Sequence, residues 1–139
     1  MKYKMIWEKS KTAYNKIIKK WLKAISTLKI KIIPKEIQKE VENDIDEFNK
    51  EELDLINDFY KYIAEFKGNY IYLNIKKNES ISEAGRLTYS GDIQNMSFAI
   101  YKYSSERYDS YEEFFPGVEC LDGTVKGALY ACNTAYPPM

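Results

Sequence analysis

The chain of 139 residues contains no histidine. Histidine is the usual general base near neutral pH and the commonest metal ligand, so both roles would fall to other side chains. Ser-His-Asp and Cys-His catalytic arrangements are excluded. Cysteine is nearly absent too: Cys120 and Cys132 do not form a CxxC pair, and two thiols alone do not make a zinc site. We therefore expect no metal and no cofactor.

Glycine is sparse, and none of the six glycines forms a GxxxxGK or GxGxxG loop for phosphate binding. No stretch approaches the ~18 uncharged apolar residues of a membrane span, and no signal peptide is visible, so a cytoplasmic location is expected. Carboxylate pairs such as Glu112 and Glu113 keep a metal-dependent nuclease open as a third hypothesis, because Asp and Glu suit Mg²⁺. No such pair stands at a strand end with a lysine two residues on, so we expect no enzymatic activity.

Charge is unevenly distributed, although the 21 basic and 21 acidic residues cancel. Residues 1–31 carry ten lysines and one acid, whereas residues 32–66 carry four lysines and eleven acids. A neutral total thus hides a basic N-terminal segment and an acidic segment after it. Either the two neutralise each other within the fold, or the basic segment is held out for an acidic partner.

The basic N-terminal segment has helical periodicity. Its large apolar residues recur every seven positions from Trp7 to Leu28, which predicts a basic amphipathic helix over residues 5–31. We interpret residues 1–33 as a basic helical arm on an α+β domain of residues 34–139. If the arm serves a partner, the contacts are expected from Lys16, Lys19, Lys20 and Lys23.

The acidic segment is expected to be helical at first. Apolar residues at spacings of four, four and three, from Ile37 to Phe48, predict a helix over 35–49 with an acidic outer face. That face is typical of a solvated helix surface. A shorter helix is expected at 51–57.

Alternating apolar residues on both sides of Gly68-Asn69 predict a β-hairpin. Its strands are expected at 59–67 and 69–77. The polar stretch 78–84 is then expected to form a loop, and a short strand is expected at 86–89. Because the first two runs flank a tight turn, we expect them to pair antiparallel.

Seven of the residues between 96 and 117 are aromatic. We expect 96–104 to be the fourth strand, with Phe98 and Ile100 in the core and the tyrosines on the other face. Residues 105–117 are expected to be an irregular loop whose aromatic side chains contact a partner, because Tyr and Phe are favoured in interface cores. The predicted contact residues are Tyr101, Tyr103, Arg107, Tyr108, Tyr111, Phe114 and Phe115.

The last element is predicted to be a helix, capped by Asp122 or Thr124 and closed by Pro137-Pro138. Its apolar stripe of small residues allows close packing on a sheet and favours a buried free thiol at Cys132, with a disulfide to Cys120 as the alternative. Strands grouped between helices are typical of an α+β fold. We therefore predict N-terminal helices, a four-stranded antiparallel sheet, and a C-terminal helix packed on it.

Several stretches resemble a recurring pattern in small prokaryotic proteins of no assigned function. They are FKGNYIYL, GRLTYSGD, FAIYKYSSERYD, FFPG and DGTVKGALYACNTAYPP. This resemblance covers roughly residues 34–138 and implies no activity and no site residues. Separately, FPGVECLDGTVKGALYACNTAY resembles the strand–helix end of HicB-type antitoxins. That second resemblance implies a protein that binds and blocks another protein.

The leading hypothesis is a small non-enzymatic binding protein that acts through protein–protein contacts, as an inhibitor, an antitoxin-like protein or an adaptor. Its partner would be another protein or a second copy of itself. The alternative is binding of single-stranded nucleic acid, in which sheet tyrosines stack on bases and the arm holds phosphates. Tyrosines in strands also have a plainer explanation, since aromatic residues favour half-buried pleated surfaces. The tyrosine face would combine Tyr70, Tyr72, Tyr89, Tyr101 and Tyr103.

Overall fold

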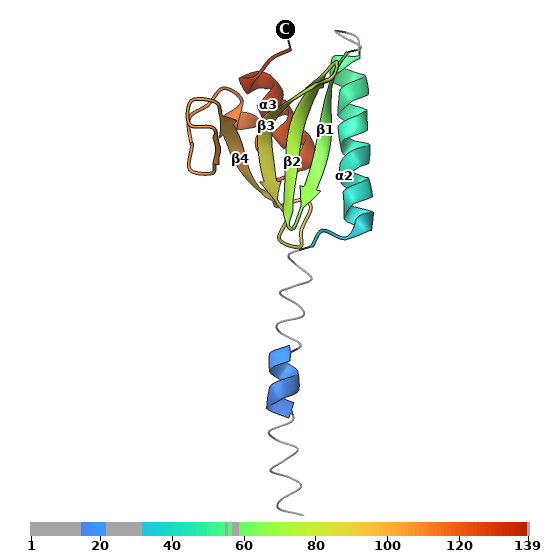
Figure 1. Cartoon of the computed structure of the whole chain (residues 1–139), viewed down its shortest axis with the longest axis vertical. Helices are drawn as coiled ribbons and strands as arrows, with labels where there is room; N and C mark the ends of the chain where they lie inside the picture. Colours follow the sequence, from blue (N-terminus) through green and yellow to red (C-terminus); the bar gives the residue numbers. More distant parts are fainter. Residues whose placement is uncertain (1–14, 22–31, 55, 57–58, 139) are drawn as a thin grey trace, which may run out of the picture.

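A computed structural model describes residues 15–21, 32–54, 56 and 59–138. Within these residues five strands form one antiparallel sheet, in which each strand pairs with the next along the chain. Two helices pack on one face of this sheet and contact each other (Figure 1). The expected α+β class is confirmed, although the sheet has one strand more than predicted. The elements are α2 (Lys35–Phe48), β1 (Tyr60–Lys67), β2 (Tyr70–Lys77), β3 (Ser80–Thr88), β4 (Ser97–Lys102), β5 (Arg107–Asp109) and α3 (Val125–Ala135).

Helix α2 confirms the prediction from apolar spacing. Its inner face buries Val41, Ile45 and Phe48, while its acidic face remains toward solvent. The helix then continues without a break into a π-helical turn, Asn49–Leu53, in place of the separate helix expected at 51–57. The wider turn inserts one extra residue per turn, so that Asn49 and Leu53 are both buried at the end of the helix.

The hairpin of β1 and β2 was predicted correctly, with Gly68 at positive φ in its turn. The prediction of a loop at 78–84 is wrong, because β3 begins at Ser80 and pairs with β2 from its first residue. Asn78 makes the two-residue turn at φ 56°, a conformation that asparagine tolerates better than most residues. This half of β3 is largely exposed, so its polar sequence carries no apolar alternation from which a strand could be recognised.

The predicted loop 105–117 is also partly wrong, since three of its residues form β5. This strand pairs with β4 through Lys102↔Arg107, Tyr101↔Tyr108 and Ile100↔Asp109. Strand β4 itself confirms the predicted facing: Ile100 is buried, and Phe98 is partly buried against the core. A strand of three residues at the edge of a sheet is too short to show a periodic pattern.

Helix α3 packs closely on the centre of the sheet. Thr124 caps it by accepting a hydrogen bond from the Gly127 amide at 3.1 Å, and Asp122 in turn accepts from the Thr124 amide at 3.0 Å. Cys132 is fully buried, and burial raises the pKa of its thiol well above the usual range. Both cysteines are free, as expected for Cys132.

Only a part of the predicted basic arm can be compared with the structure. Residues 15–21 are helical and every one of them is exposed, including Lys16, Lys19 and Lys20. Lys23 and the other residues of the predicted helix over 5–31 lie outside the described residues. Among the described helices, none has the length and the apolar character needed to cross a membrane.

Candidate functional site

The seven predicted contact residues do not form one surface. Tyr101 and Tyr108 lie opposite each other on the open face of the sheet, which is the face turned away from α2 and α3. Phe115 turns inward, where its ring centroid lies 6.0 Å from that of Phe98. Tyr111 and Phe114 project into solvent from the chain after β5. Tyr103, which follows β4, and Arg107, in β5, are both exposed.

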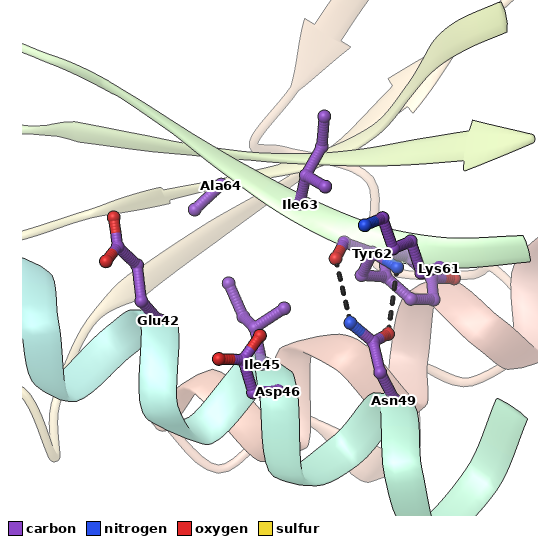
Figure 2. Close-up of a pocket in the computed structure, with 8 residues that line it drawn as sticks. All are labelled: Glu42, Ile45, Asp46, Asn49, Lys61, Tyr62, Ile63 and Ala64. Carbon is purple, nitrogen blue, oxygen red and sulfur yellow. Dashed lines mark hydrogen bonds between the residues drawn. The ribbon is translucent and has the colours of Figure 1, made fainter. Parts of the chain in front are cut away.

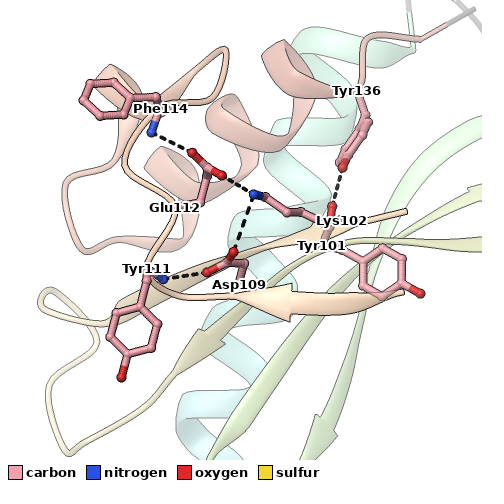
Figure 3. Close-up of polar contacts among 7 residues, drawn as sticks. All are labelled: Tyr101, Lys102, Asp109, Tyr111, Glu112, Phe114 and Tyr136. Atoms are coloured by element: carbon pink, nitrogen blue, oxygen red, sulfur yellow. Dashed lines mark hydrogen bonds and ion pairs between the residues drawn. The ribbon is translucent and has the colours of Figure 1, made fainter. Parts of the chain in front are cut away.

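The first candidate surface is the aromatic loop, defined as residues 110–117. Two carboxylates hold its backbone: Asp109 accepts a hydrogen bond from the Tyr111 amide at 2.9 Å, and Glu112 accepts one from the Phe114 amide at 3.1 Å. The Lys102 ammonium lies between these carboxylates, 3.5 Å from Asp109 and in direct contact with Glu112 (Figure 3). One lysine of β4 therefore ties both turns of the loop to the sheet.

The loop is also anchored at its far end. Gly117 has φ 99°, and a Cβ at this position would lie 2.6 Å from the Ala131 carbonyl oxygen of α3. Only glycine fits here without displacing the loop from the helix. The inward ring of Phe115 adds an apolar contact. The loop is thus held at both ends while its two central aromatic rings remain free.

The exposure of those rings is extreme. The Tyr111 side chain is 90% exposed and that of Phe114 is 86% exposed, and both point away from the sheet and the helices (Figure 3). Large apolar side chains gain about 1.5–3 kcal/mol when they are fully buried, so two of them on a braced loop represent unused binding energy. This arrangement is typical of anchor residues in interfaces.

Acid is expected to release the aromatic loop. The Tyr111 amide, and then Lys102, hold the pKa of Asp109 below its usual range, while Lys102 and the Phe114 amide do the same for Glu112. A depressed pKa stabilises the fold above the unfolded-state pKa, and this contribution disappears as pH falls through the folded-state value. Amide hydrogen exchange should therefore show protection at Tyr111 and Phe114 that is retained at pH 6 and lost below about pH 4. Unchanged protection factors would contradict this bracing.

The second candidate surface is the tyrosine cluster on the open face. The ring of Tyr108 lies 5.4 Å from that of Tyr72 and 5.0 Å from that of Tyr101, edge to face in both cases. The guanidinium of Arg86 lies over two rings, 4.3 Å from the centroid of Tyr70 and 5.2 Å from that of Tyr108. The open face therefore brings together residues of four strands.

The predicted tyrosine face is correct in part. Tyr70, Tyr72 and Tyr101 share the open face, and Tyr108 joins them because β5 exists. Tyr89 does not belong to it, since it is buried in the core. Sequence reasoning also missed Arg86 as the centre of the cluster. The alternation of Arg86 with the buried Leu87 indicated that Arg86 lies on the open face. Its partners could not be recognised from the sequence, because Tyr70 and Tyr108 are 16 or more positions away along the chain.

A hollow of about 250 Å³ opens on this face beside the rings. Three tyrosines, Tyr72, Tyr101 and Tyr108, form part of its wall. Asn74 also lines it, and this side chain is only 7% exposed, with an Oδ1 atom that has no hydrogen-bond partner. A buried acceptor without a partner carries a free-energy cost, so each one in a native structure requires an explanation. The remaining lining residues are charged: Glu65, Lys67 and Glu83.

A crevice of similar size separates α2 from β1 (Figure 2). Asn49 crosses it, donating to the Tyr62 carbonyl oxygen at 3.0 Å and accepting from the Tyr62 amide at 2.9 Å. β1 is at the edge of the sheet, so its outer backbone groups have no neighbouring strand to pair with. The two bonds from Asn49 take the place of the bonds that such a strand would make to Tyr62. We assign Asn49 a structural role at this edge.

Metal chemistry finds no support among the described residues, in which no group of three or more His, Cys, Asp or Glu side chains could hold an ion. Three carboxylate pairs could be proposed for a nuclease, namely Asp44/Asp46, Glu51/Glu52 and Glu112/Glu113. In the last pair, Glu112 already binds Lys102 and Glu113 is exposed. Among the described residues, the aromatic loop and the hollow are candidate binding surfaces. Comparison of this chain with protein-family models, with curated proteins and with solved structures found no match.

Proposed function

We propose that this protein is a small binding protein without catalytic activity of its own, and that it holds another protein through the aromatic loop. The observation that carries this proposal is the exposure of Tyr111 and Phe114 on a backbone that is already braced. A preorganised loop loses little conformational entropy on binding, so more of the energy gained from burying the rings appears as affinity. The lack of histidine is consistent with a role in binding.

The surroundings of the loop define the chemistry of the partner. Exposed carboxylates occur along the chain before, between and after the two rings, at Glu106, Glu113 and Glu119. The acidic groups nearest the rings, Asp109 and Glu112, are neutralised in part by Lys102. The proposed partner surface is therefore an apolar pocket that receives the two rings, surrounded by basic side chains. Complementary charge of this kind mainly increases the association rate and the specificity.

A double variant tests the proposal. Tyr111→Ser combined with Phe114→Ser is expected to reduce retention of the partner at least tenfold in pull-downs from the native host, because aromatic anchors each contribute about 2 kcal/mol or more. The melting temperature should not change by more than a degree or two, since neither ring packs on the fold. Quantitative mass spectrometry of the retained proteins gives the measurement.

The matched control is Ile81→Ser, which removes an apolar side chain that is 59% exposed on β3, away from the loop. This variant should retain the partner at the wild-type level. The proposal fails if the double variant and the wild type retain the same proteins in the same amounts. It also fails if native mass spectrometry of the host extract finds the wild-type chain only as a free monomer.

Binding of single-stranded nucleic acid is the second candidate, because three of the predicted tyrosines do share the open face with Arg86. Base stacking on such rings is worth about 1–3 kcal/mol per base. Against this stand Glu65 and Glu83, which line the same face and would repel phosphates. A shift of a random 20-mer at low salt that disappears as salt is raised would favour this candidate.

A further inference from the structure

The walls of the hollow on the open face have the chemistry of a cation site. The ring of Tyr108 meets those of Tyr72 and Tyr101 at interplanar angles of 61° and 67°, so it stacks face to face on neither of them. In an edge-to-face pair one ring presents its edge to a single face of the other, so each pair leaves further ring faces, which carry negative partial charge, open to another contact. A cation within about 6 Å of such a face is attracted to it.

One cation already uses this property. The Arg86 guanidinium lies over Tyr70 and Tyr108 at 4.3 and 5.2 Å, and its Nε atom is buried without a hydrogen-bond partner. Arg86 is therefore held on this face by ring contacts. The faces of the tyrosine cluster thus hold a positive charge within the fold, and the hollow lies beside the same rings.

The charged residues of the hollow add a net negative charge. Glu65 and Glu83 line it, and neither forms an ion pair with a lysine or arginine in the described part of the chain. The Glu83 carboxylate is close enough to disfavour ionisation of two hydroxyls, which adds to burial in raising the pKa of Tyr108 and Tyr101. Lys67 is the single basic residue among the lining side chains, so the lining groups sum to one negative charge, and the Arg86 guanidinium lies next to them over Tyr108.

Asn74 can add a hydrogen-bond acceptor to the hollow, and hydrogen bonds are directional. Asn74 is 7% exposed, and its Oδ1 atom has no partner. This oxygen is enclosed, and a half-turn about the last torsion angle exchanges it with the amide nitrogen, so a ligand with an N–H donor would select the orientation that turns the oxygen to the hollow. A neutral apolar ligand would make no use of the Asn74 acceptor or of the two exposed carboxylates.

We infer that this hollow binds the protonated primary amine of an alkylammonium group, either in a small molecule or at the tip of a lysine side chain. The rings attract the charge, Glu65 and Glu83 balance it, and Asn74 accepts one of its N–H donors. Lys67 carries the same group as the ligand and lies at the same hollow. It therefore opposes binding by repulsion.

A titration of the full chain with n-butylammonium tests this inference, with 1-butanol as the neutral analogue of nearly the same shape. Aromatic ¹H–¹³C spectra are expected to show shifts at Tyr72, Tyr101 and Tyr108 with the cation and none with the alcohol. Lysine-containing and arginine-free peptides, compared with the free amine, distinguish a side chain from a small molecule as the source of the group. Butyltrimethylammonium should bind more weakly, because it has no N–H donor for Asn74.

Three charge variants make the test sharper. Two of them are expected to change the affinity for butylammonium in opposite directions, and the third is a control. Glu83→Gln is expected to weaken butylammonium binding about threefold or more, whereas Lys67→Met should tighten it by a similar factor. Glu79→Gln, in the exposed turn between β2 and β3, should leave the affinity unchanged. A site that merely tolerates any ligand would not respond in opposite directions to Glu83→Gln and Lys67→Met.

Several results would overturn the inference. Equal shifts with 1-butanol would show that charge is not recognised, and equal affinity for butyltrimethylammonium would contradict the role of Asn74. An absence of ring shifts at tens of millimolar amine would exclude the site. If an oligonucleotide shifts the same rings and the amine does not, the face stacks bases instead. The Tyr111→Ser, Phe114→Ser variant should bind the amine normally, so failure of the loop proposal leaves this result unaffected.

Discussion

Replacing Phe48 with alanine is expected to lower the free energy of unfolding by about 3–5 kcal/mol, the range for removal of a buried phenylalanine. Phe48 is 1% exposed at the end of α2. Its ring meets Tyr62 of β1 at 5.7 Å and Tyr130 of α3 at 5.0 Å, edge to face in both cases. One side chain therefore joins both helices to the edge of the sheet, and its removal leaves a cavity at the point where the three elements meet.

Urea unfolding followed by circular dichroism gives the measurement, and Phe114→Ala gives the matched control. The same atoms are removed in the control, but from a ring that is 86% exposed. Its effect should stay within about 0.5 kcal/mol, as for most surface substitutions. If Phe48→Ala and Phe114→Ala had equal effects, the packing of α2 against β1 and α3 described above would be incorrect.

Replacing Asn49 with alanine is expected to cost about 1–3 kcal/mol, although a single small polar side chain is removed. Its two hydrogen bonds satisfy both the amide and the carbonyl group of Tyr62. Loss of the side chain leaves two backbone groups unpaired, and each buried group of this kind costs about 1–3 kcal/mol. The expected loss of stability is smaller than the sum of the costs for the two groups, because the crevice in Figure 2 allows water to approach the edge of β1.

Two variants separate the edge contacts from a general effect of losing an asparagine. Asn95→Ala removes the same side chain at an exposed position and should be nearly neutral. Asn49→Asp keeps the acceptor for the Tyr62 amide but loses the donor, so the Tyr62 carbonyl would face a carboxylate. Hydrogen exchange of the Tyr62 amide should accelerate in Asn49→Ala and less so in Asn49→Asp at pH 7. Equal exchange of the Tyr62 amide in the wild type, Asn49→Ala and Asn49→Asp would argue against the role of Asn49.

The two candidate binding surfaces are joined through the same short edge strand. Asp109 of β5 helps to hold the aromatic loop, and the neighbouring residue, Tyr108, lies in the tyrosine cluster. Beyond the cluster, Tyr136 after α3 donates a hydrogen bond to the Tyr101 carbonyl oxygen, and its ring meets that of Tyr103 at 5.5 Å.

Local periodicity was sufficient for the parts of the fold that depend on one segment alone. The spacing of Ile37, Val41, Ile45 and Phe48 determined α2, because a helix places residues three and four positions apart on one side. Alternation around Gly68-Asn69 determined the first hairpin in the same way. The sequence indicated Asp122 or Thr124 as the cap of the last helix, and the structure selects Thr124, which accepts from an amide three residues later.

Tertiary structure alone decided the rest. The first half of β3 is polar and is a strand only because β2 offers it a complete edge of backbone partners, and β5 forms in the same way on β4. The tyrosine cluster depends on that last pairing, since Tyr108 reaches Tyr72 only when β5 adds to the sheet. Asn49 likewise faces Tyr62 only because α2 packs beside β1 at the edge of the sheet. Side-chain direction follows from short periods in the sequence, whereas the neighbours that a side chain meets depend on pairings between distant segments.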